Sequence, residues 1–140
     1  MLVRLLYVSR AADAALKDLD NILQHARTYN AEHGITGALC YSSNIFMQVL
    51  EGSRTEVNRL YATILRDPHH TDVELLHYEE ISERSYGSWT MGRVDISRLN
   101  TSTVLKYSEH ADFNPYANSG KMSLAMMQEL VATANIIGRA

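Results

Sequence analysis

Three polar residues, Tyr7, Asn30 and Gln48, occupy positions that the apolar pattern of the sequence marks as buried. Each shares its side of a strand or helix with apolar neighbours, which are Val3 and Leu5 for Tyr7, Phe46 and Leu50 for Gln48, and Leu16, Leu19, Leu23 and Ala26 for Asn30. A buried polar group without a partner costs about 1–3 kcal/mol. We therefore expect all three side chains to find partners in the space between helices and sheet.

The chemistry that these side chains share is hydrogen bonding to a flat molecule with a polar edge. A phenol and two carboxamides offer donors and acceptors inside an apolar pocket, and planar heterocyclic ligands are held in this way. Taken one at a time, each residue is more simply interpreted as a core polar group bonded to the backbone. Taken together, the three residues indicate a binding pocket.

Other candidate sites have less support. His69 and His70 are adjacent in a loop and cannot readily face one ion, and no carboxylate or cysteine spacing completes a metal site. The single cysteine, Cys40, is expected to be a small buried hydrophobe and not a nucleophile, because no histidine signature accompanies it. The sequence also lacks a Walker loop, a GxGxxG fingerprint and a GxSxG elbow, which argues against an enzyme.

The composition is that of one globular domain. The chain has 140 residues, of which 46% are hydrophobic, and a formal net charge of -3. Its Lys and Arg are scattered, which argues against direct nucleic-acid binding. The N-terminus lacks the features of a signal peptide, and no apolar stretch approaches the roughly 20 residues that cross a membrane. With a single cysteine, these features favour a cytoplasmic protein.

Five strands and two long helices are expected to position the candidate residues. The strands are predicted at residues 2–9, 35–41, 45–50, 73–81 and 89–94. The first helix is predicted to begin at Asp13, as an N-cap, and to end at Gly34. A capping box at residues 53–56 opens the second helix, and Asp67-Pro68 ends it. The order β-α-β-β-α-β-β indicates an α+β, ferredoxin-like sandwich with both helices on one face of the sheet.

Residues 1–95 are expected to form this unit, and residues 96–140 a C-terminal helical extension. The last predicted helix carries a wide apolar stripe of Leu124, Met126, Met127, Leu130, Val131, Ala134 and Ile137. Because the sandwich leaves one face of its sheet bare, we expect this stripe to cover that face or to pack on a partner.

Six blocks of the sequence carry a family resemblance in their order and spacing. They are residues 5–9 (LLYVS), Tyr29-Asn30, residues 35–39 (ITGAL), residues 46–52 (FMQVLEG), Arg66-Asp67-Pro68 and residues 88–91 (SWTM). These blocks closely resemble the BLUF family, the sensors of blue light using FAD. The resemblance covers about the first 95 residues, and the tail resembles that of the short, stand-alone members.

The resemblance implies that the isoalloxazine ring of a flavin lies between the two helices. Asn30 and Gln48 would meet the polar edge of the ring, and Tyr7 would hydrogen-bond to Gln48. The residues implied to contact the cofactor are Ile22, Ala26, Tyr29, Asn30, Gln48, Ile64, Asp67 and His70. The implied cofactor is FAD, with FMN and riboflavin as alternatives, because His69 stands where the family more commonly has an arginine.

Trp89 and Met91 are expected to share one face of the fifth strand. The alternation of apolar residues favours plain core positions for both. The resemblance instead implies that they report the state of the flavin. Both interpretations stay open from the sequence alone.

The function implied by the resemblance is that of a blue-light photoreceptor. Tyr7 would give up an electron and then a proton through Gln48, and Gln48 would be left rotated or tautomerised with a new hydrogen bond to the flavin. The change would pass to the C-terminal helices and an unidentified partner protein, with a homodimer contact as one form of output. The alternatives are a ferredoxin-like ligand-binding module without photochemistry and a small enzyme that uses Tyr7 or a histidine as acid or base.

Overall fold

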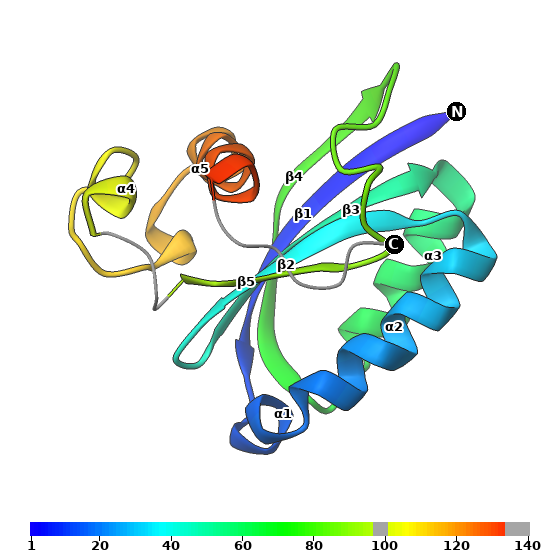
Figure 1. Ribbon diagram of the computed structural model, residues 1–140, viewed down its shortest axis with the longest axis horizontal. Coiled ribbons are helices and arrows are strands. Elements are labelled where there is room, and N and C mark those ends of the chain that lie inside the picture. The colour runs from blue at the N-terminus through cyan, green and yellow to red at the C-terminus, as the bar shows by residue number, and fades with distance from the viewer. Residues whose placement is uncertain (97–100, 134–140) are drawn as a thin grey trace.

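The computed structural model describes residues 1–96 and 101–133. Its strands are β1 (Leu2–Ala11), β2 (Thr36–Ser42), β3 (Ile45–Ser53), β4 (His70–Ile81) and β5 (Gly92–Asp95). Its helices are α1 (Asp13–Lys17), α2 (Leu19–His33), α3 (Arg54–Leu65), α4 (Thr101–Leu105) and α5 (Gly120–Thr133), with a 3₁₀ turn η2 (Pro115–Ala117) before α5. Helices α2 and α3 lie on one side of the sheet, and α4 and α5 lie on the other (Figure 1).

The five strands form one sheet in the order β4-β1-β3-β2-β5. The first four strands pair antiparallel, and β5 pairs parallel to β2. This order follows from two crossovers through α2 and α3, each of which returns the chain to the same sheet. The structure therefore confirms the predicted α+β, ferredoxin-like arrangement with both crossover helices on one face.

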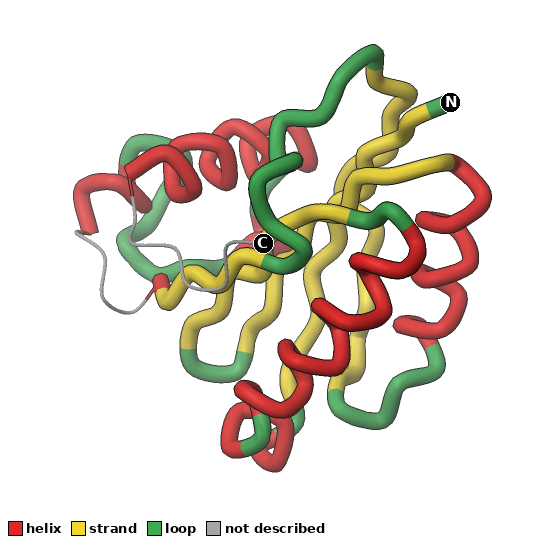
Figure 2. Tube along the Cα trace, turned by 45° about the vertical axis from the view of Figure 1, so that its right-hand side comes forward, coloured by secondary structure: helices red, strands yellow, loops and turns green. Residues whose placement is uncertain are grey.

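The sheet separates two helical layers (Figure 2), and an apolar core lies under each of them. The α2/α3 core consists of Val3, Leu5, Tyr7, Ala11, Ala15, Leu19, Leu23, Ile35, Leu39, Phe46, Leu50, Val57 and Met91. The α5 core consists of Leu6, Ala38, Cys40, Met47, Val49, Tyr86, Trp89, Val94, Ile96, Val104, Met126, Met127 and Leu130. Strand β1 contributes to both cores and is buried from Val3 to Ser9, so it has no solvent-facing side there.

The first helix differs from its prediction at its start. It is divided into α1 and α2 at Asp18, whose φ of -106° and ψ of 17° depart from helical values. Asp13 is the first residue of α1, and the N-cap is Ala12, without a side-chain cap. The apolar spacing continues across Asp18, which is why periodicity predicted one helix. The expected end is confirmed, because Gly34 has a φ of 67°, the left-handed conformation that glycine adopts without strain.

The Ser53 half of the capping box predicted at residues 53–56 is confirmed. The backbone amide of Glu56 donates to Ser53 Oγ at 3.2 Å, which satisfies one of the amides that a helix leaves unpaired at its start. Ser53 is accordingly the N-cap of α3.

The prediction that Trp89 and Met91 share one strand face is wrong. Regular pairing with β2 begins only at Gly92, opposite Ala38, and both residues precede it. Met91 belongs to the α2/α3 core, whereas Trp89 belongs to the α5 core. The backbone amide of Gly37 does donate to the Trp89 carbonyl at 3.0 Å, but the next two carbonyls, of Thr90 and Met91, accept from side chains of α2.

Helix α5 lies against the face of the sheet that α2 and α3 leave open. Met126, Met127 and Leu130 are buried there, and Leu124 and Val131 pack beside them. Ala134 and Ile137, which complete the predicted stripe, lie outside the described residues. No helix in the described ranges is long and apolar enough to span a membrane.

The N-terminal end of α5 is seated unusually close to β4. A Cβ atom added to Gly120 would lie 1.8 Å from the backbone oxygen of Leu76. Gly120→Ala is therefore expected to lower the free energy of unfolding by about 1–3 kcal/mol, because α5 must move away from the strand. Gly87→Ala is the control, since its Cβ would meet only the side chain of Arg84, at 3.5 Å. Urea denaturation measures both variants, and equal midpoints would contradict the prediction.

Candidate functional site

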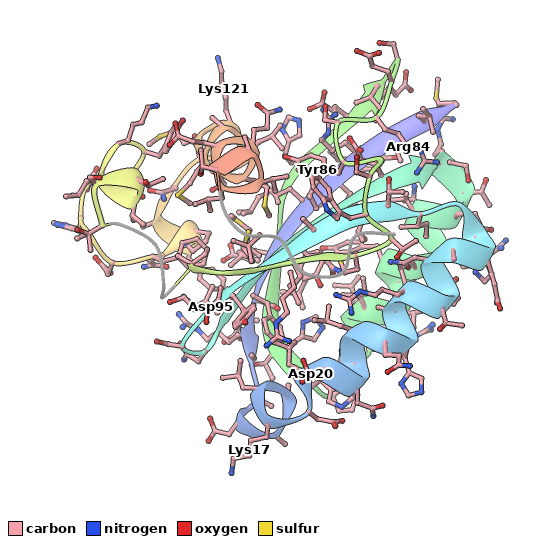
Figure 3. All side chains as sticks on the ribbon, viewed as in Figure 1. Lys17, Asp20, Arg84, Tyr86, Asp95 and Lys121 are labelled. Carbon is pink, nitrogen blue, oxygen red and sulfur yellow. The ribbon has the colours of Figure 1, made fainter. Side chains whose placement is uncertain are left out.

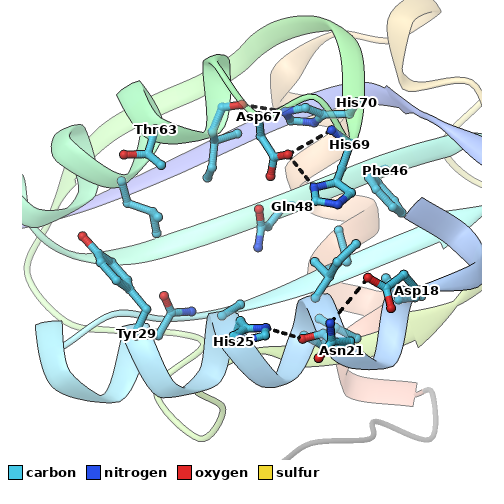
Figure 4. Close-up of a pocket in the computed structure, with 18 of the residues that line it drawn as sticks. Asp18, Asn21, His25, Tyr29, Phe46, Gln48, Thr63, Asp67, His69 and His70 are labelled. Carbon is cyan, nitrogen blue, oxygen red and sulfur yellow. Dashed lines mark hydrogen bonds and ion pairs between the residues drawn. The ribbon is translucent and has the colours of Figure 1, made fainter. Parts of the chain in front are cut away.

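A pocket of about 530 Å³ lies between α2 and α3, over strands β1, β2 and β3. Nine of the residues singled out from the sequence line it, namely Tyr7, Ile22, Ala26, Tyr29, Asn30, Gln48, Ile64, Asp67 and His70. Figure 4 shows Gln48 rising from the sheet into the space between the helices, with Tyr29 toward one end and Asp18 and Asn21 toward the other. Leucines, isoleucines, Ala26 and Phe46 make much of the wall, so the polar groups stand out in an apolar setting.

Tyr7 and Gln48 form a hydrogen-bonded pair on the floor of this pocket. They face each other in the register of β1 and β3, and the Tyr7 hydroxyl donates to Gln48 Oε1. At the other end of the carboxamide, Gln48 Nε2 donates to Met91 Sδ at 3.2 Å. The acceptor end and the donor end of Gln48 are thus engaged by two different segments of the chain.

The surroundings of Tyr7 keep its hydroxyl neutral. Burial raises the pKa of this hydroxyl far above its ordinary value, and the nearby Asp67 carboxylate raises it further. The ring of Tyr7 is flanked by the rings of Tyr61 and His70, at 5.8 and 6.0 Å between centroids. A neutral phenol in this position donates its hydrogen bond to Gln48, and removing its proton requires an acceptor at hand.

Helix α2 fastens the segment that carries Met91. Asn30 is buried, and its Nδ2 donates to the Thr90 carbonyl at 2.6 Å. Arg27 Nε donates to the Met91 carbonyl at 3.1 Å. Successive carbonyls of a strand point to opposite edges, so one of these two bonds takes up a carbonyl that continued pairing with β2 would use, and regular pairing begins only at Gly92.

Arg27 escapes a search for polar residues on buried faces, because its long charged side chain is only partly buried. It lies three positions before Asn30, so both side chains emerge from neighbouring points on one side of α2. This spacing from Asn30 is the one signal in the sequence that could have identified Arg27 as a residue of the site.

The polar rim of the pocket is formed by the turn after α3. The Asp67 carboxylate accepts the backbone amide of His69 at 2.9 Å and lies 2.6 Å from His69 Nδ1. Burial alone would raise the pKa of Asp67, but the hydrogen bonds and the positive potential of the histidines lower it overall. His70 turns the other way, with Nε2 2.6 Å from the Ile64 carbonyl and Nδ1 2.7 Å from Ser9 Oγ. A carbonyl can only accept, so Nε2 carries the proton.

Trp89 and Met91 are placed differently from the other predicted residues, because neither lines the pocket. Met91 reaches the site through its sulfur, which contacts Gln48, and Trp89 lies on the opposite side of the sheet. The site therefore consists of a pocket with a polar floor, Gln48 at its centre, and a segment behind Gln48 that spans both cores.

The chain matches the family model described as "Sensors of blue-light using FAD" over residues 2–92. Among curated proteins, it is 40% identical over 92 residues to the photoactivated adenylate cyclase subunit beta of Euglena longa, which covers 64% of this chain and 11% of that protein. It is 41% identical over 88 residues to the photoactivated adenylate cyclase subunit alpha of Euglena gracilis, and this match covers 62% of this chain and 9% of that protein. The chain thus spans about a tenth of the length of these curated relatives.

Two solved structures resemble almost the whole chain. The photo-activated state of BlsA superimposes with a TM-score of 0.85 and 34% sequence identity, covering 96% of this chain and 97% of that one. The dark-state structure of BlrB, described as a BLUF protein, has a TM-score of 0.78 and 28% identity, covering 94% of this chain and 95% of that one. The likeness to these two structures therefore extends beyond residues 2–92, which match the family model, into the C-terminal part of the chain.

The bond between Tyr7 and Gln48 predicts a measurable contribution to stability. Tyr7→Phe is expected to lower the free energy of unfolding by about 1–3 kcal/mol, because it leaves a buried amide oxygen without its donor. Tyr61→Phe is the matched control, since Tyr61 is an adjacent, partly exposed tyrosine and its replacement should change stability by less than about 0.5 kcal/mol. Urea denaturation of both variants tests the prediction. A Tyr7→Phe variant as stable as Tyr61→Phe would show that the hydroxyl contributes nothing to the fold.

Proposed function

The chain belongs to the BLUF family, the sensors of blue light using FAD, and we propose that its pocket holds a flavin whose protein surroundings are rearranged by blue light. The observation that carries the proposal is the hydrogen-bonded series of Tyr7, Gln48 and Met91 along the pocket floor. It places a neutral phenol, an amide with two unlike ends and a sulfur acceptor in direct contact.

The residues present fit a flavin ring. Such a ring is flat, and it needs apolar surfaces over its faces and hydrogen-bonding groups along one edge. Ile22 and Ile64, from α2 and α3, would hold the faces, while Asn30 and Gln48 would meet the polar edge. We propose FAD as the cofactor, which the family description names. FMN and riboflavin carry the same ring and are the alternatives.

The switch that we propose is a change in which hydrogen-bonding groups the Gln48 amide presents to its neighbours. When bound, the flavin supplies the absorption of blue light and the electron chemistry. Tyr7 holds a proton that points at Gln48 Oε1, so this oxygen is the nearest place for the proton to go. Rotation or tautomerisation of the amide would then present a donor where it had presented an acceptor. The bond from Nε2 to Met91 is the weaker of the two, because a thioether sulfur is a poor acceptor.

The route to the output runs along the segment that carries Met91. Met91 belongs to the α2/α3 core and Trp89 to the α5 core, with Thr90 alone between them. We propose that a change at Gln48 alters the packing of Met91, then of Trp89, and then of the C-terminal residues 96–140. One rearranged hydrogen bond is worth about 0.5–1.5 kcal/mol, which shifts a two-state equilibrium only about two- to tenfold. The response should therefore be graded.

The output is proposed to reach an unidentified protein partner or a second copy of the chain, in the cytoplasm. The chain itself is proposed to act as a sensor and not as an enzyme. This assignment is supported by the family match, which lies in the sensor region. The cyclase activity named for the Euglena relatives belongs to proteins of which this chain spans about a tenth.

Gln48→Leu tests the proposed switch. The variant is expected to retain bound flavin, because the helix walls and Asn30 remain, and to lose the light-induced absorption shift, because the amide is gone. Purified wild-type protein should be yellow and should shift reversibly under blue light, and Gln24→Leu, an exposed position on α2, should behave like it. Absorption spectra in the dark and after illumination give the answer. A normal reversible shift in Gln48→Leu would sink the mechanism.

Asn30→Ala tests the proposed binding mode. It should retain less flavin than the wild type, by about tenfold in affinity, because a ring-edge hydrogen bond and the bond to Thr90 are both lost. Asn58→Ala, an exposed asparagine on α3, should bind normally. The ratio of flavin to protein absorbance measures retention, and chromatography of the released flavin should identify FAD. Equal retention in the two variants would contradict a role for Asn30 at the ring.

A further inference from the structure

A buried ion pair lies on the face of the sheet opposite the pocket. Arg4 and Glu51 face each other in the register of β1 and β3, and both are almost fully buried, at 6% and 0% exposure. Arg4 Nη2 lies 2.7 Å and Nε 2.8 Å from Glu51 Oε2. A buried carboxylate is tolerated only when its charge and its acceptor sites are satisfied.

Glu51 also binds the backbone of the loop between β4 and β5. Its carboxylate accepts the amide of Tyr86 at 2.7 Å and the amide of Ser85 at 3.0 Å. Arg4 Nη2 donates to Ser85 Oγ at 2.8 Å, which closes a ring of bonds around the carboxylate. The side chain of Tyr86 is buried in the α5 core, so this end of the loop is fixed at both its backbone and its side chain.

Arg84 secures the same loop from outside. Its guanidinium donates to the Gly34 carbonyl at 2.7 Å, to Thr36 Oγ1 at 2.8 Å and to the Glu51 carbonyl at 3.3 Å. Arg84 and Tyr86 are both on the loop that follows β4 (Figure 3). Arg84 therefore ties the loop to the start of β2 and to the end of β3.

The loop leads directly from Glu51 to the pocket. The Trp89 amide donates to the Tyr86 carbonyl at 3.5 Å, and the Trp89 carbonyl accepts from Gly37 at 3.0 Å. Met91 follows, with its sulfur 3.2 Å from Gln48 Nε2. Residues 87–90 separate Tyr86 from Met91. Among them, Trp89 is bonded to Tyr86 and Gly37, and Thr90 to Asn30, so these bonds link the end of the loop that Glu51 holds to the segment of Met91.

We propose that Glu51 is a positioning residue for the photoswitch: its carboxylate fixes the loop from Ser85 to Met91 and thereby sets how Met91 meets Gln48. The proposal rests on the proposed function of Gln48. A carboxylate suits this task because its two oxygens accept from Arg4 and two backbone amides together. A glutamine has one acceptor oxygen, and its NH₂ group would face donors, so Glu51→Gln keeps the shape of the side chain and loses the anchoring.

Two measurements on Glu51→Gln test this proposal. Hydrogen exchange of the dark protein should show protection at Ser85 and Tyr86 reduced by about tenfold or more. The dark recovery after blue light should be at least about threefold faster. The reason is that Met91, which packs against Gln48, is held less firmly in the variant and resists the return of the Gln48 amide less. If Glu51 acts through Met91, the same substitution made in a Met91→Leu background should change the recovery by less than about 1.5-fold.

Glu79→Gln is the matched control. Glu79 is the second carboxylate near Arg4, at 3.4 Å and 35% exposed, so its replacement removes a charge from the same arginine without touching the carboxylate that binds the loop. It should leave both exchange and recovery unchanged. If Glu51→Gln does not fold, the Arg4→Gln/Glu51→Gln double variant, which leaves no uncompensated charge, takes its place in the same measurements.

The outcomes separate the two proposals. A wild type that binds flavin but shows no light-induced shift defeats the proposed function, and with it the role of Glu51. A wild type that switches normally, together with a Glu51 variant that recovers at the wild-type rate, defeats only the role of Glu51. An equal acceleration in the native and Met91→Leu backgrounds would likewise overturn it, because the effect would then be general loosening and not the position of Met91.

Discussion

Strands β1 and β3 are covered on both faces, so every polar side chain that they carry there must be paired within the protein. The two pairs described above both satisfy this constraint in the same way, between residues that face each other across the two strands. Tyr7 meets Gln48 on the pocket side, and Arg4 meets Glu51 on the side of α5. A slip of one residue in this register would move each side chain to the other face and break both pairs at once. The register of these strands is thus the condition both for the Tyr7–Gln48 pair on the pocket floor and for the Arg4–Glu51 pair that binds the loop after β4.

Much of this arrangement could be predicted from the sequence, because the information lies in local periodicity. The alternation along β1 and β3 placed Tyr7 and Gln48 on the α2/α3 side, and the helical spacing placed Asn30 at the inner edge of α2, where the structure has it. The same alternation contains Arg4 and Glu51, as charged residues within buried runs of opposed strands. The reasoning applied to Gln48 could also have predicted this pair, because a charged side chain on a strand that is covered on both faces needs a partner within the protein.

The segment from Trp89 to Met91 could not be predicted in this way. An alternating pattern is the same whether the carbonyls of a segment pair with a neighbouring strand or with side chains of a helix. Here they pair with Asn30 and Arg27 of α2, and the segment crosses from one core to the other instead of lying flat along β2. The break at Asp18 eluded prediction for a related reason, because the apolar spacing continues through the change in backbone conformation at this residue. Local pattern determines which side chains are buried, whereas the partners of the backbone are set by the assembled fold.

The position of the pocket also bears on how long the protein persists in a cell. The space lies between α2 and α3 and is walled by side chains of the α2/α3 core, so a ligand bound there would pack against that layer. A molecule that binds only the folded chain adds RT ln(1 + [L]/Kd) to its stability, so the folded fraction rises with the supply of that molecule. Small changes in folded fraction alter the rate at which proteases remove a protein. For a flavin-binding chain of this design, the folded fraction would therefore follow the supply of flavin, independently of any light.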